Sequence, residues 1–127
     1  MFLNDNKEVY ALGTNDQKCL IVEEAVLKKL TLIKENVDDI QCGWSHTVFL
    51  TNGMVETYGK NNFRQLGRNN EEKYVNSEEE ISHIRSGTEF SFAIGKNKQL
   101  YGWGWNEHNN ITEAGETISN PVKVPVP

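Results

Sequence analysis

The chain has 127 residues and a formal net charge of -5, with 24% charged residues and no excess of Lys or Arg. This balance argues against nucleic acid or an anionic membrane as a partner that is held by simple electrostatics. Since no segment approaches the roughly 20 apolar residues of a membrane span and residues 1–7 lack the features of a secretory signal, we expect a cytoplasmic protein, with the nucleus as a second location.

The first predicted element is a strand over residues 8–13, which leads into a phrase that the chain uses three times. The phrase is Gly-x-Asn, four further residues and then Leu or Ile, and it occupies residues 13–20, 59–66 and 104–111. Its first Gly therefore recurs at spacings of 46 and 45 residues. A period in this range indicates a repeat architecture.

Residues 22–36 allow two interpretations. Residues 30–33 would suit a strand, but the apolar positions also recur every three or four residues, as on one face of a short helix (Val22, Val26, Leu30 and Ile33). We expect a short helix or a loop in this segment, followed by a strand.

The next element is a hairpin. Residues 45–51 alternate as a strand, turn at Asn52-Gly53 and return over residues 54–59. Asn-Gly between two alternating runs is the strongest short signal for a hairpin. The phrase Ile-x-x-Gly precedes it at residues 40–43.

A second hairpin repeats this pattern. Ile-x-x-Gly returns at residues 84–87, a spacing of 44 residues, so two unrelated phrases keep nearly the same period. The strand over 89–94 then places Phe90, Phe92 and Ile94 on one face. We expect its turn at residues 95–97 and the return strand at 99–104.

Two segments are expected to lie outside the main strands. Residues 68–80 contain five Glu and predict a solvated surface loop. Residues 121–127 contain three prolines, which exclude a central strand and suit a sheet edge or a linker.

The predicted hairpins carry apolar residues on both faces, so each small sheet must stack on a neighbour. Radial stacking of small antiparallel sheets is the propeller solution to this problem. We therefore expect an all-β chain that forms an incomplete β-propeller of about two to three blades. Its units are a partial blade with a connecting segment at 1–36, a first full repeat at 37–80 and a second full repeat at 81–127 with an incomplete C-terminal edge.

The repeats resemble those of the regulator of chromosome condensation family. The first full copy carries the matching pattern at Ile40, Gly43, His46, Asn52-Gly53, Tyr58-Gly59, Asn61 and Gln65-Leu-Gly67. The second copy is divergent, since Phe90 replaces the His and residues 110–112 replace Gln-Leu-Gly. The resemblance implies blades of a seven-bladed propeller.

Residues 102–109 are similar to the last blade of the subfamily that contains the fungal alpha-tubulin suppressor. That similarity implies a noncatalytic protein-interaction module that regulates tRNA modification by Elongator and diphthamide synthesis through a small zinc-binding electron carrier. The alternative that the family implies is a guanine nucleotide exchange factor for a small GTPase.

Two sets of residues stand out. The positions expected to support the repeat are Gly13, Asn15, Gly43, His46, Gly59, Asn61, Gly87, Gly104 and Asn106, with each Asn bonding its own turn and His46 bonding backbone within its blade. Those expected to contact a partner are Trp44, Trp105 and His108, whereas Trp103 is expected to pack inside its blade.

No catalytic or cofactor site is predicted. Ser45 and His46 are neighbours on a strand and point to opposite faces, so they cannot exchange a proton directly. Cys42 and His46, with His83 or His108, lack the spacing of a zinc site. We therefore expect a protein that is not an enzyme and whose open blade faces need further blades or self-association.

Overall fold

The computed structural model describes residues 1–127 and consists of strands, turns and loops. Its strands are β1 Phe2–Leu3, β2 Val9–Thr14, β3 Val26–Lys34, β4 Asp39–Cys42, β5 His46–Thr51, β6 Met54–Gly59, β7 Ile81–Ser86, β8 Phe90–Gly95, β9 Leu100–Gly104 and β10 Ile118–Val124. None of its segments is a helix with the length and hydropathy that a membrane span requires.

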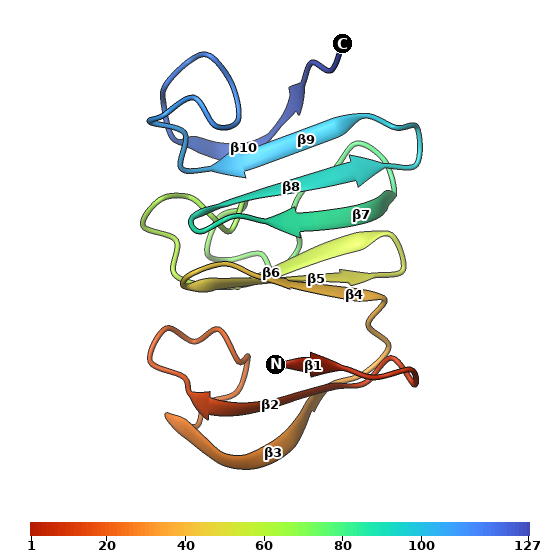
Figure 1. The fold of residues 1–127 in the computed structure, drawn as a ribbon, viewed down its shortest axis with the longest axis vertical. Helices are drawn as coiled ribbons and strands as arrows, with labels where there is room; N and C mark the ends of the chain where they lie inside the picture. Colours follow the sequence, from red (N-terminus) through yellow and green to blue (C-terminus); the bar gives the residue numbers. More distant parts are fainter.

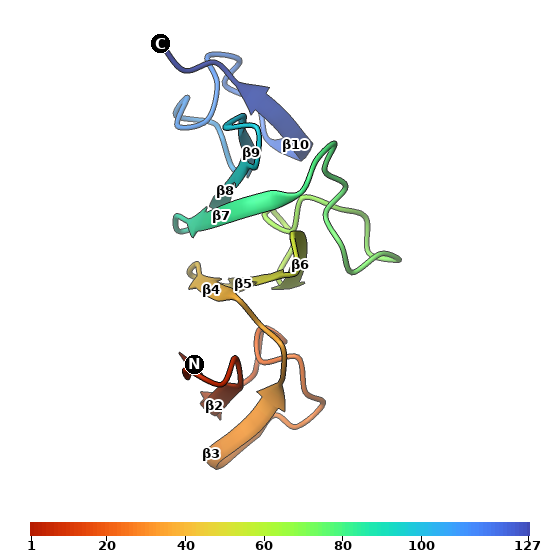
Figure 2. The same ribbon diagram turned by 90° about the vertical axis from the view of Figure 1, so that its right-hand side faces the viewer.

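The strands form three small antiparallel sheets, which we name blades 1, 2 and 3. Blade 1 has the strand order β1-β2-β3, blade 2 the order β4-β5-β6, and blade 3 the order β10-β9-β8-β7. Figure 1 shows the blades stacked along the long axis of the molecule. Figure 2 shows the stack edge-on, with β4 and β7 on the left and β6 and β10 on the right.

The hairpin of blade 2 turns where the sequence predicts. Asn52 and Gly53 both have positive φ, at 53° and 79°, which is the pattern of a type I′ turn. Such a turn matches the twist of the flanking strands, so pairing continues from Thr51 and Met54 to His46 and Gly59.

Of the two alternatives expected within residues 22–36, the loop followed by a strand is present and the short helix is not. Residues 26–34 form β3, which pairs with β2 through Leu27 opposite Gly13 and Thr31 opposite Ala11. Leu27 is buried by this pairing. Sheet formation therefore overrides the weak helical spacing of the apolar residues.

Residues 68–80 are not wholly a solvated loop. Tyr74 forms an isolated antiparallel bridge with Glu56 of β6, and Val75 is buried in the core. This short bridge extends the outer edge of blade 2. In blade 3 the corresponding edge is a full strand, β10, which contains Pro121 at a register irregularity and pairs only with β9, as the prolines predict.

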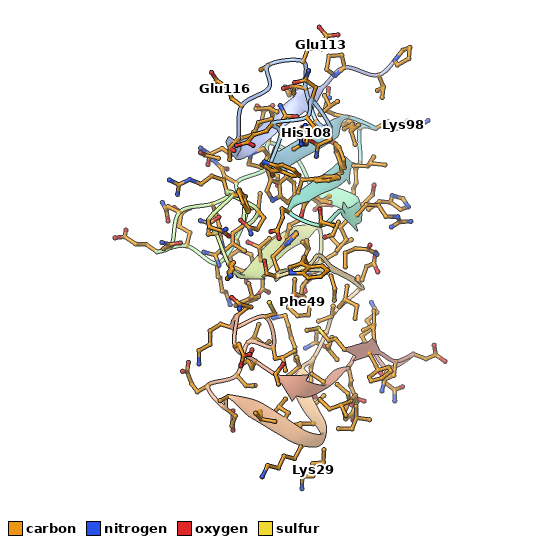
Figure 3. All side chains as sticks on the ribbon, turned by 60° about the vertical axis from the view of Figure 1, so that its left-hand side comes forward. Lys29, Phe49, Lys98, His108, Glu113 and Glu116 are labelled. Atoms are coloured by element: carbon orange, nitrogen blue, oxygen red, sulfur yellow. The ribbon has the colours of Figure 1, made fainter.

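The core lies between the blades. Its largest apolar cluster joins blade 2 to blade 3 and contains Val48, Leu50, Val55, Val75, Ile81, Ile84, Ala93, Tyr101 and Trp103. A smaller cluster of Val9, Val37 and Phe49 joins blade 1 to blade 2, and Figure 3 shows Phe49 at that junction. Each sheet is therefore stabilised by its neighbour.

Candidate functional site

The long loops gather at one end of the three sheets, on the left-hand side of Figure 1. They are residues 15–25, 60–68 and 105–117, and the turns at 43–45 and 87–89 lie at the same end. We call this end the loop rim. It holds the three Gly-x-Asn phrases and all of the residues that the sequence predicts as partner contacts.

Each Gly-x-Asn phrase forms a loop that its Asn side chain holds together. The side-chain oxygens of Asn15, Asn61 and Asn106 accept a bond from the backbone N–H five residues further on, at 3.0, 3.2 and 2.7 Å. Their amide nitrogens donate to a carbonyl six or seven residues further on. Three loops of different sequence therefore share one rigid shape.

Gly59 and Gly104 end β6 and β9 where the chain turns into these loops. Their φ values are 115° and 106°, a region that L side chains rarely adopt. A Cβ atom on Gly59 would lie 2.4 Å from the carbonyl oxygen of Ser45, and one on Gly104 would lie 2.6 Å from that of Glu89. Both positions thus bring two backbone segments into contact at the rim.

Polar side chains join blades 2 and 3 at the rim. His46 Nε2 lies 2.8 Å from Ser91 Oγ. The Gln65 amide donates to the carboxylate of Glu89 at 2.7 Å, and the Ser45 hydroxyl donates to the same carboxylate at 3.3 Å. The expected bond from His46 to backbone within its own blade is wrong, because its partner is a side chain of the next blade.

The ring of His46 packs where Gly43 leaves space for it. A Cβ atom on Gly43 would lie 2.1 Å from the imidazole, and one on Gly87 would lie 2.2 Å from the ring of Phe90. Phe90 therefore takes the place of His46 in the second copy. Because a phenyl ring needs no hydrogen-bond partner, Phe90 fills this place by packing alone.

His46 is neutral near pH 7. Its side chain is 1% exposed, and burial lowers its pKa from 6.5 to about 4. Its role is thus to fill the seam between two blades and to bond Ser91. A charged imidazole would have to be buried with no carboxylate hydrogen-bonded to it.

Two tryptophans near the rim have opposite environments. Trp44 is 83% exposed, although its backbone is fixed by an N–H bond to the carbonyl of Thr88 at 2.8 Å. Trp103 is 1% exposed and donates its indole N–H to the carbonyl of Gln65 at 2.9 Å. Trp44 is therefore available to a partner, whereas Trp103 packs between the blades.

Trp105 belongs to an aromatic cluster that joins two rim loops. Its ring centroid lies 5.9 Å from that of Phe63 and 5.0 Å from that of His108. Sequence reasoning did not single out Phe63. The signal was present, because Phe63 and His108 are both the fourth residue after the first Gly of their phrases.

The rim holds no set of residues that suits metal binding or nucleophilic catalysis. No group of three or more His, Cys, Asp and Glu side chains gathers anywhere in the chain, so Cys42, His46, His83 and His108 form no shared site. Burial raises the pKa of the Cys19 thiol, which therefore stays protonated near pH 7. The arrangement suits contact with another molecule through shape and aromatic surface.

Comparison with known proteins agrees with the repeat pattern. No family model matches the chain. The chain is 30% identical to the ultraviolet-B receptor UVR8 of Arabidopsis thaliana over 91% of its own length and 28% of the receptor. It is 28% identical to the guanine nucleotide exchange factor SRM1 of Saccharomyces cerevisiae, over 98% of the chain and 31% of that protein.

Solved structures show the same fold. The yeast protein RCC1 (Prp20), in a crystal structure with Kap60, matches 98% of the chain with a TM-score of 0.83 at 16% identity, and 34% of that protein is covered. A second structure of Prp20 gives a TM-score of 0.80. These matches establish the fold as part of a propeller and support the RCC1-like repeat family. The chain spans about a third of the length of these proteins.

Proposed function

We propose that this chain is a protein-docking part of an RCC1-like propeller and that its loop rim contacts a small GTPase. Trp44 carries the proposal. Its indole is 83% exposed, yet its backbone is held at the seam between two blades, so the backbone loses little conformational freedom when a partner covers the indole. Trp is also among the residues that contribute most to binding when they become buried in an interface.

The aromatic cluster of Phe63, Trp105 and His108 supports the same surface. These side chains come from two loops whose shapes are fixed by Asn61 and Asn106. A preformed aromatic surface loses less entropy on binding than a flexible loop does. The rim therefore combines one projecting anchor with a rigid aromatic patch.

The names of the relatives indicate the class of partner. SRM1, which matches 98% of this chain, is named a guanine nucleotide exchange factor. A regulator of this kind acts by binding a GTPase. Since the chain spans 31% of SRM1, we propose binding for the chain and exchange for a complete propeller.

The proposal is tested by measuring the binding of the chain to a panel of purified small GTPases. At least one GTPase should bind, and Trp44→Ala should weaken that binding by roughly thirtyfold, as for an interface residue worth about 2 kcal/mol. Tyr74→Ala, on the outer edge of blade 2, is the control and should leave binding unchanged. No binding across the panel, or equal binding by Trp44→Ala, would contradict the proposal.

A narrower function rests on the resemblance of residues 102–109 and stays a prediction. It is the regulation of Elongator tRNA modification and of diphthamide synthesis through a small zinc-binding electron carrier, in the cytoplasm or the nucleus. An affinity purification from cell extract that recovers no component of either pathway would count against it.

A further inference from the structure

The face of blade 1 that points away from blade 2 is apolar and uncovered. Val9 and Ala11 of β2 are buried against the rest of the molecule, so the alternate residues of β2 and their partners point outward. The outward set includes Phe2 at 56% exposure, Leu12 at 48%, Leu30 at 53% and Leu32 at 42%. A contiguous group of large exposed apolar side chains marks a surface that binds another molecule.

The opposite end of the stack also presents an apolar face. In β8, Ser91 and Ala93 are buried toward blade 2, whereas Phe92 and Ile94 point the other way. A hollow of about 320 Å³ lies on this face, lined by His83, Ile84, Arg85, Phe92, Ile94 and Leu100. One end of the chain thus offers projecting leucines and the other offers a hollow bordered by phenyl, isoleucine and leucine side chains.

The two end faces carry opposite charges near the loop rim. Lys28 and Lys29 of β3 are exposed on blade 1, and Glu113 and Glu116 are exposed in the loop of blade 3. Figure 3 shows Lys29 at one extremity of the molecule and Glu113 and Glu116 at the other.

Further polar groups border the two end faces. On blade 1, the carboxylates of Glu8 and Glu35 lie near Tyr10 and raise the pKa of its hydroxyl. On blade 3, His83 and Arg85 border the hollow. Arg85 is already paired with blade 2, since its Nη1 lies 3.8 Å from Asp39 Oδ2. If the two faces meet with their rims aligned, Lys28 and Lys29 therefore face Glu113 and Glu116.

We propose that the open face of blade 1 docks on the open face of blade 3 of a second copy of this chain, head to tail. This contact between two chains has the same sheet-on-sheet packing that joins the blades within one chain. It is a heterologous contact, which closes into a ring or continues as an open array depending on the rotation at each step. It is independent of the partner at the loop rim, because Trp44 lies at the seam of blades 2 and 3.

Sedimentation velocity tests the contact through variants on each face. The wild-type chain should self-associate with rising concentration, and Leu30→Asp and Ile94→Asp should each weaken association by roughly tenfold or more. Both residues are substantially exposed, so the monomer should stay folded, which circular dichroism checks. Met54→Asp is the matched control, since Met54 is 47% exposed on blade 2. A wild-type chain that stays monomeric at high micromolar concentration overturns the proposal.

Charge exchange tests the direction of the contact. Lys28→Glu with Lys29→Glu, and separately Glu113→Lys with Glu116→Lys, should each weaken association because like charges then face each other. All four substitutions together should restore it. The head-to-tail arrangement is contradicted if neither pair of substitutions weakens association. It is also contradicted if the fourfold variant does not recover association.

Discussion

The imidazole of His46 in β5 lies 2.8 Å from the hydroxyl of Ser91 in β8, and this contact joins two blades at a buried position. Both side chains are at most 1% exposed. A polar pair in such a place is stable only while the histidine is neutral, because no carboxylate is hydrogen-bonded to the ring. The seam between blades 2 and 3 is therefore sensitive to acid.

We expect the free energy of unfolding to fall as pH drops from 6.5 to about 4. In the unfolded chain His46 binds a proton below pH 6.5, whereas in the folded chain its pKa is about 4. The unfolded state thus binds more protons between these values. The contribution of His46 to the free energy of unfolding is therefore fully present above pH 6.5, and it decreases by about 3 kcal/mol as the pH falls to about 4.

Urea unfolding at several pH values measures this dependence, and His46→Phe isolates the contribution of the histidine. Phe is the residue at the matching position of blade 3, so the ring should fit beside Gly43. The variant should lose roughly 1 kcal/mol at neutral pH, since the Ser91 hydroxyl is left without its partner. Its stability should depend less on pH than that of the wild type, and equal slopes would show that His46 is not responsible.

A second prediction concerns the ion pair between blades 1 and 2. Lys34 Nζ lies 3.0 Å from Glu56 Oε1, and the two side chains are 17% and 3% exposed. Removing one partner leaves a buried charge uncompensated, so Lys34→Ala should reduce the free energy of unfolding by about 3 kcal/mol. Guanidinium unfolding measures the loss.

The exposed pair of Lys7 and Asp38 provides the control. Its side chains are 63% and 35% exposed, so Lys7→Ala should cost less than about 1 kcal/mol. The double variant Lys34→Met with Glu56→Leu should recover much of the loss of Lys34→Ala, because no buried charge remains. Equal losses for Lys34→Ala and Lys7→Ala would show that the buried pair is effectively solvated.

Features of the fold that depend on local chemistry were predictable from the sequence. Asn52-Gly53 predicts its turn because few residue pairs adopt two successive positive φ values. The phrase Gly-x-Asn predicts a loop because the amide group reaches backbone a few residues away in the chain. The stacked blades followed from apolar residues on both faces of each hairpin.

Features that depend on distant partners were not predictable. Residues 26–34 form a strand because β2 is available to pair with them, and their own apolar spacing also fits a helix. The partner of His46 is 45 residues away in the chain, so no local pattern indicates that the ring bonds Ser91. The position of Phe63 in its phrase matches that of His108, but its contact with Trp105 of another blade was not predictable.

The Asn side chains of the rim loops give a third prediction. The buried side chain of Asn106 accepts bonds from two backbone N–H groups, at 2.7 and 3.1 Å, and donates to the carbonyl of Thr112 at 3.1 Å. Asn106→Ala leaves these groups unpaired and should cost roughly 2 to 3 kcal/mol in thermal or urea unfolding. Asn120→Ala, at an exposed position of β10, should cost less than about 0.5 kcal/mol, and a similar loss in both variants would contradict the role of Asn106.

The glycines that begin the repeated phrases allow the energetic cost of backbone strain to be distinguished from the cost of close contact. Gly13 and Gly59 have nearly equal φ values of 112° and 115°. A Cβ atom on Gly13 would meet nothing within 4 Å, whereas one on Gly59 would lie 2.4 Å from the carbonyl oxygen of Ser45. Gly13→Ala should therefore cost only the backbone strain, roughly 1 to 2 kcal/mol, and Gly59→Ala should cost distinctly more because β5 must also move. Urea unfolding of the two variants measures the difference, and equal losses would mean that the approach of β6 to Ser45 adds no constraint of its own.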